Sequence, residues 1–143
     1  MKKFILSISL IAVTMTGISV AQDLNSKDVP ETVKTVFAKK YPDAKKVSWE
    51  KEKGNYEANW GGKSGEDSSV TLTPSAIYVE IVVAIPVGQL PPSVAPYVNK
   101  QYNRAKIREA GKVTDAAGRH MYEAEIKGKD LIFDEKGGFI KED

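Results

Sequence analysis

The sequence predicts an α+β fold built from two tandem repeats, each consisting of one helix followed by a four-strand antiparallel meander. An internal repeat and a change of hydrophobic period within each copy predict it. The copies match at Val29-Pro30 and Leu90-Pro91, Val33 and Val94, Phe37 and Val98, Lys39 and Lys100, Tyr41 and Tyr102, Ala44 and Ala105, Lys45 and Lys106, and again at Tyr56-Glu57-Ala58 and Tyr122-Glu123-Ala124. We expect both helices to pack on one face of the sheet.

Residues 1–21 have the pattern of a signal peptide. Lys2-Lys3 is followed by an apolar run over 4–13, and Ser19-Val20-Ala21 supplies small residues for cleavage. The alternative is a retained membrane anchor, but this run is shorter than the roughly 20 residues that span a bilayer. No cysteine is present for lipid attachment. We therefore expect a mature, periplasmic or secreted chain that begins at Gln22 and has no stable membrane anchor.

Removal of the signal peptide changes the charge balance. The whole chain has 21 basic and 19 acidic residues, and two of the basic ones are Lys2 and Lys3, so the mature net charge is zero. A neutral chain lacks the positive field of a nucleic-acid-binding protein. Residues 22–143 are long enough for a single domain, with repeats over 28–89 and 90–143. With no cysteine, the core stands without disulfides.

In the first copy, Pro30 begins the predicted helix and Pro42 ends it. Residues 22–27 are expected to be mobile. Alternation predicts a hairpin over 47–52 and 56–60 whose aromatic residues, Trp60 among them, face the helix. A binding role for these aromatics is the alternative. A third strand around Val70 and a long fourth strand over 77–87 follow.

The second copy differs at its start because Pro92 and Pro96 have no counterpart in the first. Pro96 is tolerated in a first helical turn, so we expect a helix over 94–103 with Ser93 as its N-cap. Strands are expected over 106–114, 120–127, 130–134 and 139–141, separated by glycine-containing turns.

Signals for catalysis, metal ions and cofactors are weak. His120 is the only histidine and lies beside a glycine turn. No nucleophile elbow, phosphate-binding loop or metal-ligand spacing is present in the sequence. We therefore expect a protein that is not an enzyme and has neither a metal site nor a cofactor.

The long strand 77–87 is apolar on both sides. Its odd-numbered residues should face the helices, and its even-numbered residues should face away from them. A sheet covered on one face needs no apolar residues on the other. They are explained by local cover, by self-association or by a partner site. The expected binding residues are Tyr78, Val82 and Ala84 as a central strip, with Glu57 and Glu80 as its rim. In the second copy, Ile140 and Glu142 match Tyr78 and Glu80. We expect the first copy to dominate any contact with a partner.

Two stretches carry a family resemblance: V-P-x-x-V-x-x-x-F-x-K-x-Y-P-D-A over 29–44 and Y-E-A-E-I-K-G-K-D-L-I-F-D-E-K-G-G-F-I-K-E over 122–142. With Trp49-Glu50 and Asn55-Tyr56-Glu57-Ala58, the sequence resembles the PepSY-like family of beta-lactamase-inhibitor-like small periplasmic proteins. The resemblance implies tandem helix-plus-sheet repeats, an architecture like that of beta-lactamase inhibitor protein and a periplasmic address. It implies no activity. The sequence departs from the family pattern at Pro74-Ser75-Ala76, where an Asp/Gly-rich turn is expected.

Two functions follow from these observations. The first is a non-catalytic periplasmic binding module that engages an unidentified protein through its open sheet face, as an inhibitor or regulator of the peptidase or beta-lactamase type. The second is an envelope structural or small-ligand-binding protein with no protein target. A concave sheet with an apolar strip at its middle favours the first, and a closed apolar pocket between helices and sheet favours the second.

Overall fold

A computed structural model describes residues 22–63 and 67–143, so the predicted signal peptide lies outside the described part of the chain. The described elements, in chain order, are β1 (Gln22–Leu24), the 3-10 turn η1 (Ser26–Asp28), α1 (Glu31–Lys40), β2 (Ser48–Glu52), β3 (Asn55–Trp60), β4 (Ser68–Leu72), β5 (Tyr78–Ala84), the 3-10 turn η2 (Val87–Gln89), α2 (Val94–Gln101), β6 (Glu109–Asp115), β7 (His120–Ile126), β8 (Lys129–Asp134) and β9 (Phe139–Glu142).

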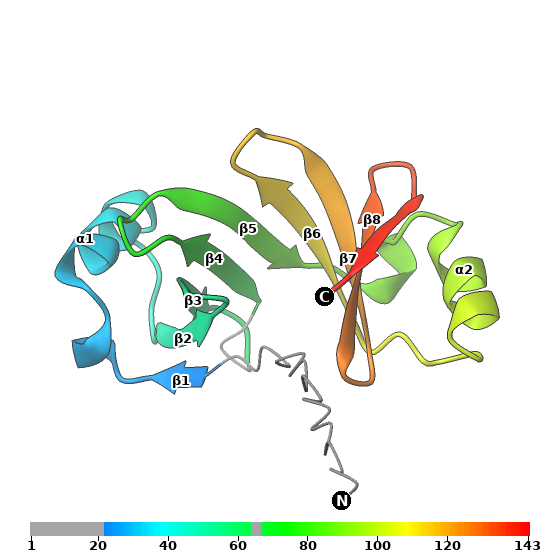
Figure 1. Ribbon diagram of the computed structural model, residues 1–143, viewed down its shortest axis with the longest axis horizontal. Coiled ribbons are helices and arrows are strands. Elements are labelled where there is room, and N and C mark those ends of the chain that lie inside the picture. Colours follow the sequence, from blue (N-terminus) through cyan, green and yellow to red (C-terminus); the bar gives the residue numbers. More distant parts are fainter. Residues whose placement is uncertain (1–21, 64–66) are drawn as a thin grey trace, which may run out of the picture.

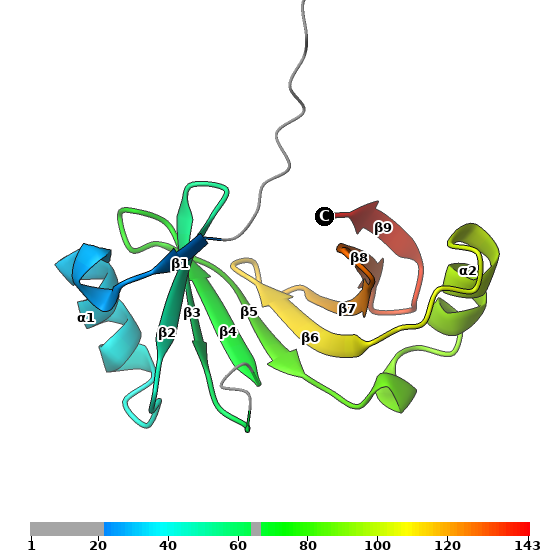
Figure 2. The same ribbon diagram turned by 90° about the horizontal axis from the view of Figure 1, so that it is seen from below.

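The strands form one nine-stranded sheet in simple chain order, and every neighbouring pair is antiparallel. Helix α1 precedes β2–β5, and α2 precedes β6–β9. The pairing of β5 with β6 joins the two halves into a continuous surface. The sheet curls strongly, and the two helices lie on its outer face at opposite ends (Figures 1 and 2).

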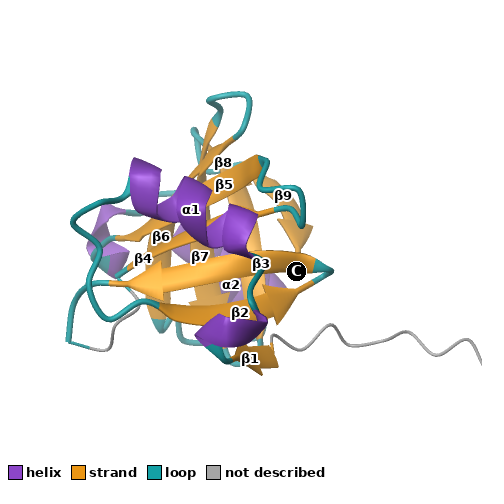
Figure 3. Ribbon diagram, turned by 90° about the vertical axis from the view of Figure 1, so that its left-hand side faces the viewer, coloured by secondary structure: helices purple, strands orange, loops and turns teal. Residues whose placement is uncertain are grey.

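The core beneath α1 is aromatic. Val33 and Phe37 point from the helix onto the outer face of β2–β4, where Trp49 packs edge-on against Phe37 at 5.3 Å between ring centroids. Figure 3 shows α1 running across these strands. Trp60 also contacts Phe37, at 5.2 Å, but it stays half-buried, so the expected full burial of this indole is only partly met.

The core beneath α2 uses the positions that the internal repeat predicts. Val94 and Val98 are fully covered and pack on Leu131 and Phe133 of β8. Each helix therefore buries two side chains one turn apart, Val33 and Phe37 in α1 and Val94 and Val98 in α2. The two cores are separate clusters, because the middle of the curled sheet lies between the helices (Figure 2).

The helix ends differ slightly from the expected ones. Pro30 is the N-cap residue of α1 instead of its first helical residue, and α1 ends before Pro42 as expected. Ser93 is at the N-cap position of α2, but its hydroxyl does not cap the helix. The hydroxyl donates instead to the carbonyl oxygen of Gly137 at 2.9 Å, which ties α2 to the β8–β9 turn.

Residues 22–27 were expected to be mobile, and this prediction is wrong. Gln22–Leu24 pairs with β2 as strand β1, and Leu24 packs against the core beneath α1. Asn25 then accepts a hydrogen bond from the backbone N–H of Lys27 and starts the following 3-10 turn. Backbone pairing and one apolar contact outweigh the polar composition that suggested mobility.

Three hairpin turns share one hydrogen-bond pattern, over 73–77, 115–119 and 134–138. In each, the backbone N–H of the first residue donates to the carbonyl oxygen of the last, and the side-chain oxygen of the first residue accepts from the backbone N–H of the last. The fourth position has a positive φ, which glycine adopts without strain. Gly118 and Gly137 fill it in two turns, and Ala76 fills it in the first with φ 61°. The stretch 74–76 therefore departs from the family pattern in sequence, while its backbone keeps the shape of the other two turns.

Candidate binding face

The inner face of the curled sheet encloses a cavity of about 580 Å³ that is lined by both halves of the molecule. Its floor is apolar. Val82, Val113 and Met121 stand in register on β5, β6 and β7, with Ile132 of β8 nearby. Gly111 belongs to this floor because a Cβ at that position would lie 2.6 Å from Cγ1 of Val82. The floor has the alternation that sheet geometry requires, since the neighbouring residues on each strand face outward.

Carboxylates from both halves of the sheet lie beside this floor. Burial, the largest effect, and repulsion from neighbouring acids raise the pKa of Glu57, although a hydrogen bond from Ser69 opposes the shift. Burial likewise raises the pKa values of Glu80 and Asp130. The strongest effect is at Glu123, where burial, together with Asp130, Glu80 and other acids, raises the pKa from 4.5 to about 8. Negative charge in this cavity is therefore costly.

The internal repeat explains two of these carboxylates. Glu57 lies between Tyr56 and Ala58 on β3, and Glu123 lies between Tyr122 and Ala124 on β7. In both triplets the alanine is completely buried beneath a helix, so the glutamate between it and the tyrosine faces inward. The repeat therefore places a glutamate on the inner face of each half.

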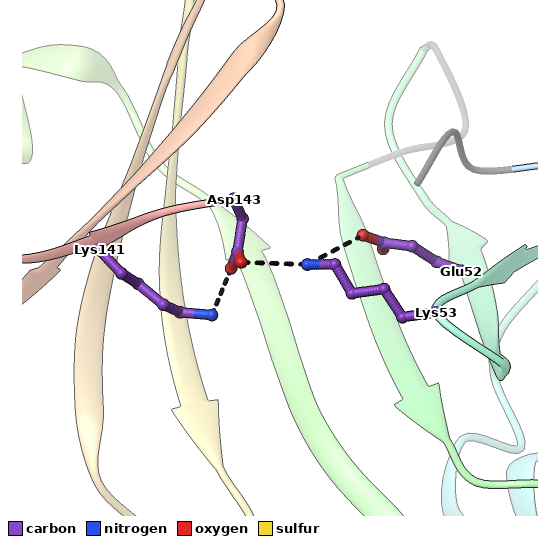
Figure 4. A network of polar contacts seen from close by, with 4 residues as sticks. All are labelled: Glu52, Lys53, Lys141 and Asp143. Carbon is purple, nitrogen blue, oxygen red and sulfur yellow. Dashed lines mark hydrogen bonds and ion pairs between the residues drawn. The ribbon is translucent and has the colours of Figure 1, made fainter. Parts of the chain in front are cut away.

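An ion-pair network spans the mouth of the cavity, and we name it the rim bridge. Lys53, in the β2–β3 turn, places Nζ 3.0 Å from Oδ1 of Asp143 and 3.6 Å from Oε1 of Glu52. Lys141 pairs with the same Asp143 carboxylate from β9 (Figure 4). These contacts raise the pKa of Lys53. For Asp143, burial works the other way, but the two lysines outweigh it and lower its pKa. The rim bridge joins two segments that are far apart in the sequence.

The structure places four of the five expected binding residues on this inner face: Glu57, Glu80, Val82 and Ala84 line the cavity. Tyr78 does not line it, so the expected strip of Tyr78, Val82 and Ala84 is wrong at Tyr78. A β-bulge is the reason. Thr71 pairs with Glu80 but Leu72 pairs with Tyr78, so Val79 is an extra residue and the side-chain alternation shifts by one.

The bulge turns Tyr78 to the outer face. Its ring packs against the α1 core, Nζ of Lys40 lies 4.0 Å from the ring centroid, and its hydroxyl donates to the carbonyl oxygen of Thr114. The same bulge recurs between β8 and β9, where Ile132 pairs with Lys141 and Phe133 with Phe139. Tyr78 therefore corresponds to Phe139, and the expected match with Ile140 is displaced by one residue.

The expectation that helices cover the odd-numbered face of the long strand also needs correction. Ile81 packs against the α1 core, but Ile77 is 63% exposed and Val83 is 43% exposed. Val79 lines the inner cavity because of the bulge. The helices sit over the ends of the curled sheet (Figure 2). The strand that joins its halves therefore keeps the side chains of Ile77 and Val83 exposed.

The second half contributes residues that sequence reasoning did not select. Val113, Met121, Glu123 and Ile132 all line the cavity, so the inner face is shared between the halves and is not dominated by the first. Glu123 could have been found from the repeat of Tyr56-Glu57-Ala58. The other three could not, because their approach to Val82 depends on the curl of the sheet.

A second hollow, of about 270 Å³, lies beside the end of α1. It is lined by Phe37, Tyr41, Trp49 and neighbouring residues, and it is a shallow depression on the helix side and not an enclosed chamber. Among residues 22–63 and 67–143, no group of three or more His, Cys, Asp or Glu side chains is arranged to hold a metal ion. No helix in the same ranges is long and apolar enough to cross a bilayer.

Comparison with known proteins gives a family match and a fold match. The model of a family described as "Putative beta-lactamase-inhibitor-like, PepSY-like" matches residues 18–62 and 64–141. No curated protein matches the chain.

Several solved structures share the fold. A protein from Bacteroides eggerthii described as "putative periplasmic" is 19% identical, with a TM-score of 0.64 over 80% of this chain and 88% of that one. A DUF2874 family protein from Bacteroides uniformis is 20% identical, with a TM-score of 0.61 over 80% and 88%. A BLIP-like protein from Bacteroides fragilis is 21% identical, with a TM-score of 0.52 over 80% and 84%.

Proposed function

The chain belongs to the PepSY-like, beta-lactamase-inhibitor-like family, and we propose that it is a non-catalytic binding module that holds a protein partner on the inner face of its sheet. The observation that carries this proposal is the inner cavity, with an apolar floor and a polar rim. Stable protein interfaces have the same anatomy, an apolar centre surrounded by polar groups. The outer face is already occupied by α1 and α2 near its ends.

A protein partner suits this surface better than a small ligand. The cavity lies between the two halves of the sheet, and residues from β2 through β9 line it. The hollow beside α1 is small and shallow, so it gives little support to the alternative of a small-ligand-binding protein. Inhibition or regulation of a peptidase or beta-lactamase is the finer form of the proposal. It rests on the family description and on the BLIP-like neighbour, which is analogy at the level of the fold.

The proposed location is the periplasm. The order of basic, apolar and small residues over 1–21 supports export. The structural neighbour from Bacteroides eggerthii, which is described as "putative periplasmic", agrees with it. We also propose that the two halves are copies of one unit, because the same turn and the same bulge recur at equivalent places in both.

Site-directed photocrosslinking in exporting cells tests the proposed function. A photoreactive amino acid is placed at Ala84, on the inner face, or at Lys112, which is exposed on the outer face of the neighbouring strand. The two positions differ mainly in the face they report. Protein adducts from the Ala84 position and none from the Lys112 position are expected. Adducts from Lys112 alone, or from neither position, contradict the proposal.

A further inference from the structure

We propose that the inner face takes a basic segment of its partner, an extended stretch with lysine or arginine side chains whose stems lie on the apolar floor and whose charged ends reach the inner carboxylates. This inference rests on the proposed function and names the chemistry of the partner. It is carried by the lining of the inner cavity, which we call the trough, by the shortage of internal counter-charges and by the lysine that lies between two carboxylates of that lining.

Four inner carboxylates form no direct ion pair with a described basic residue. In the part of the chain that the structure describes, Glu57, Glu80, Glu123 and Asp130 take part in none of the salt bridges, which all involve other carboxylates. Among the residues that the structure describes, Lys53 and Lys141 are the basic ones that line the cavity, and both pair with Asp143. Lys141 and Lys53 offset only part of the electrostatic cost at Glu80, where burial still raises the pKa. Folding thus concentrates carboxyl groups in a partly desolvated trough that has few cations of its own.

The rest of the molecule has the opposite balance. Residues 22–143 carry no net charge. Eight carboxylates and two lysines of the described residues line one cavity, so the excess of basic residues lies elsewhere. Lys39, Lys40, Lys45 and Lys46 lie exposed around the end of α1 on the outer side. A concave wall of low dielectric strengthens the field of the charges that line it. The trough therefore attracts cations although residues 22–143 carry no net charge.

The apolar floor selects the kind of cation. Val82, Val113 and Met121 form a continuous row in the middle of the trough, with acids on both flanks. Lysine and arginine bury their methylene stems on apolar surface and keep their charged ends on polar groups. A simple inorganic cation would use only the acids. A basic peptide segment uses the floor and the acids together.

Lys53 shows how such a cation is held. Its ammonium group comes from the first half and sits between Glu52 and Asp143, at the mouth of the trough. An incoming basic side chain competes with Lys53 for Asp143. The rim bridge is exposed and therefore weak, so a partner can displace it. Removing the Lys53 charge should strengthen docking instead of weakening it.

Protonation gives the inference an independent signature. Glu123 faces charged groups from the neighbouring strands, and a docked cation would favour its ionised form. Docking should therefore release protons near neutral pH, and affinity should rise as the pH approaches 8. The titratable or charged groups that face it or line the same cavity are Glu50, Glu52, Lys53, Glu57, Glu80, Glu109, Glu125, Asp130, Lys141 and Asp143.

The test uses titration calorimetry with two short synthetic peptides of alternating lysine and valine, identical except that one has every lysine acetylated. Acetylation keeps the stems and removes the charges, so it isolates the charge requirement. The protein variants are Glu123→Gln, which removes an inner carboxylate, Glu135→Gln, which removes an exposed carboxylate in the β8–β9 turn, and Lys53→Met. Circular dichroism shows that each variant is folded before it is titrated.

We expect binding of the charged peptide and none of the acetylated one. The observed binding enthalpy should vary with the ionisation enthalpy of the buffer, which is the sign of proton release. Glu123→Gln should weaken binding by about tenfold, the equivalent of one lost charge interaction of about 1.4 kcal/mol. Glu135→Gln should leave binding unchanged, and Lys53→Met should tighten it by about two- to threefold, in line with a weak exposed pair. Equal binding of both peptides, or equal losses in Glu123→Gln and Glu135→Gln, overturns the inference.

The two proposals fail in different ways. If Ala84 yields adducts whose crosslinked segments carry no basic residues, the basic chemistry is wrong and the inner-face function stands. If Ala84 yields none, the function itself is wrong. If sedimentation shows the mature protein associating with itself, and Glu123→Gln abolishes this, the occupant is the basic region of a second copy, and the proposal of a different partner is overturned.

Discussion

The two faces of the sheet are built from the same strands and have opposite characters. On β8, Phe133 points outward, is completely buried beneath α2 and contacts Tyr97 edge-on at 5.6 Å. Its neighbour Ile132 points inward, to the cavity. The carboxyl groups that line this cavity, Glu123 above all, have raised pKa values. The outer face near each helix provides stability through close packing. The inner face keeps costly charges, which suits a surface kept for binding.

The largest expected effect tests the outer face. Phe133→Ala should lower the free energy of unfolding by about 3–5 kcal/mol, because it removes a large buried ring and leaves a void. Ile132→Ala, one residue away, is the matched control. It should cost about 2 kcal/mol, at the low end for such truncations, because the space opens into a hydrated cavity. Chemical denaturation measures both, and equal losses would contradict the division between the faces.

The second prediction concerns the pH dependence of the inner face. The pKa of Glu123 is raised by folding, so its contribution to stability is greatest below its ordinary value of 4.5 and is lost as the pH rises through about 8. Glu57, Glu80 and Asp130 shift in the same direction. Between these pH values the native protein should lose about 4–5 kcal/mol of stability from Glu123.

Glu123→Gln should remove most of this loss, and denaturation midpoints across the pH range measure it. Folding lowers the pKa values of Asp115 and Glu142, so these two groups have the opposite pH dependence. Their contribution to stability is present above the ordinary carboxyl pKa and is lost as the pH falls through the lowered values. A Glu123→Gln variant with the same pH profile as the native protein would show that the inner face imposes no electrostatic cost.

A smaller effect compares the equivalent turns of the two halves. Ala76 holds φ 61° where Gly137 holds φ 84°. Ala76→Gly should stabilise the protein by about 0.5–1 kcal/mol, since glycine relieves the left-handed strain but loses more chain entropy. Gly137→Ala should destabilise it by at least about 1 kcal/mol, because the new Cβ would lie 2.1 Å from Oγ of Ser93. Thermal melts measure both changes in stability, and changes of the same sign would contradict the equivalence of the two turns.

The smallest effect is at the rim bridge. Lys53→Met should change the free energy of unfolding by less than about 0.5 kcal/mol, because the pair is partly exposed and screened by salt. A loss of several kcal/mol would mean that the bridge holds the two halves together, and that the mouth of the trough is part of the stability-bearing structure.

Much of the fold could be predicted because its signals are local. Proline and the spacing of Val33 and Phe37 define α1, and alternation defines the β2–β3 hairpin. The turn over 134–138 follows from Asp134 and two glycines. Family membership, suggested by the residues over 29–44 and 122–142, is confirmed. Each of these depends on neighbours along the chain, which a sequence displays directly.

The positions that could not be predicted depend on distant segments. Tyr78 was assigned to the wrong face because a bulge leaves no mark in a pattern of alternating apolar residues. The second half of the inner face was missed because only the curl of the sheet brings Val113 and Met121 beside Val82. Lys53 and Asp143 are 90 residues apart, so nothing local predicts their contact.

By itself, the sequence determined which segments become helices and strands, and it placed the same Tyr-Glu-Ala triplet in both halves, because backbone propensity and period act over a few residues. Only the tertiary structure decided that Glu57 and Glu123 share one cavity, and that Lys53 of one half pairs with Asp143 of the other beside it. The physical reason is that burial and charge interactions depend on distance in space. A twisted, curled sheet sets that distance only after all nine strands have paired.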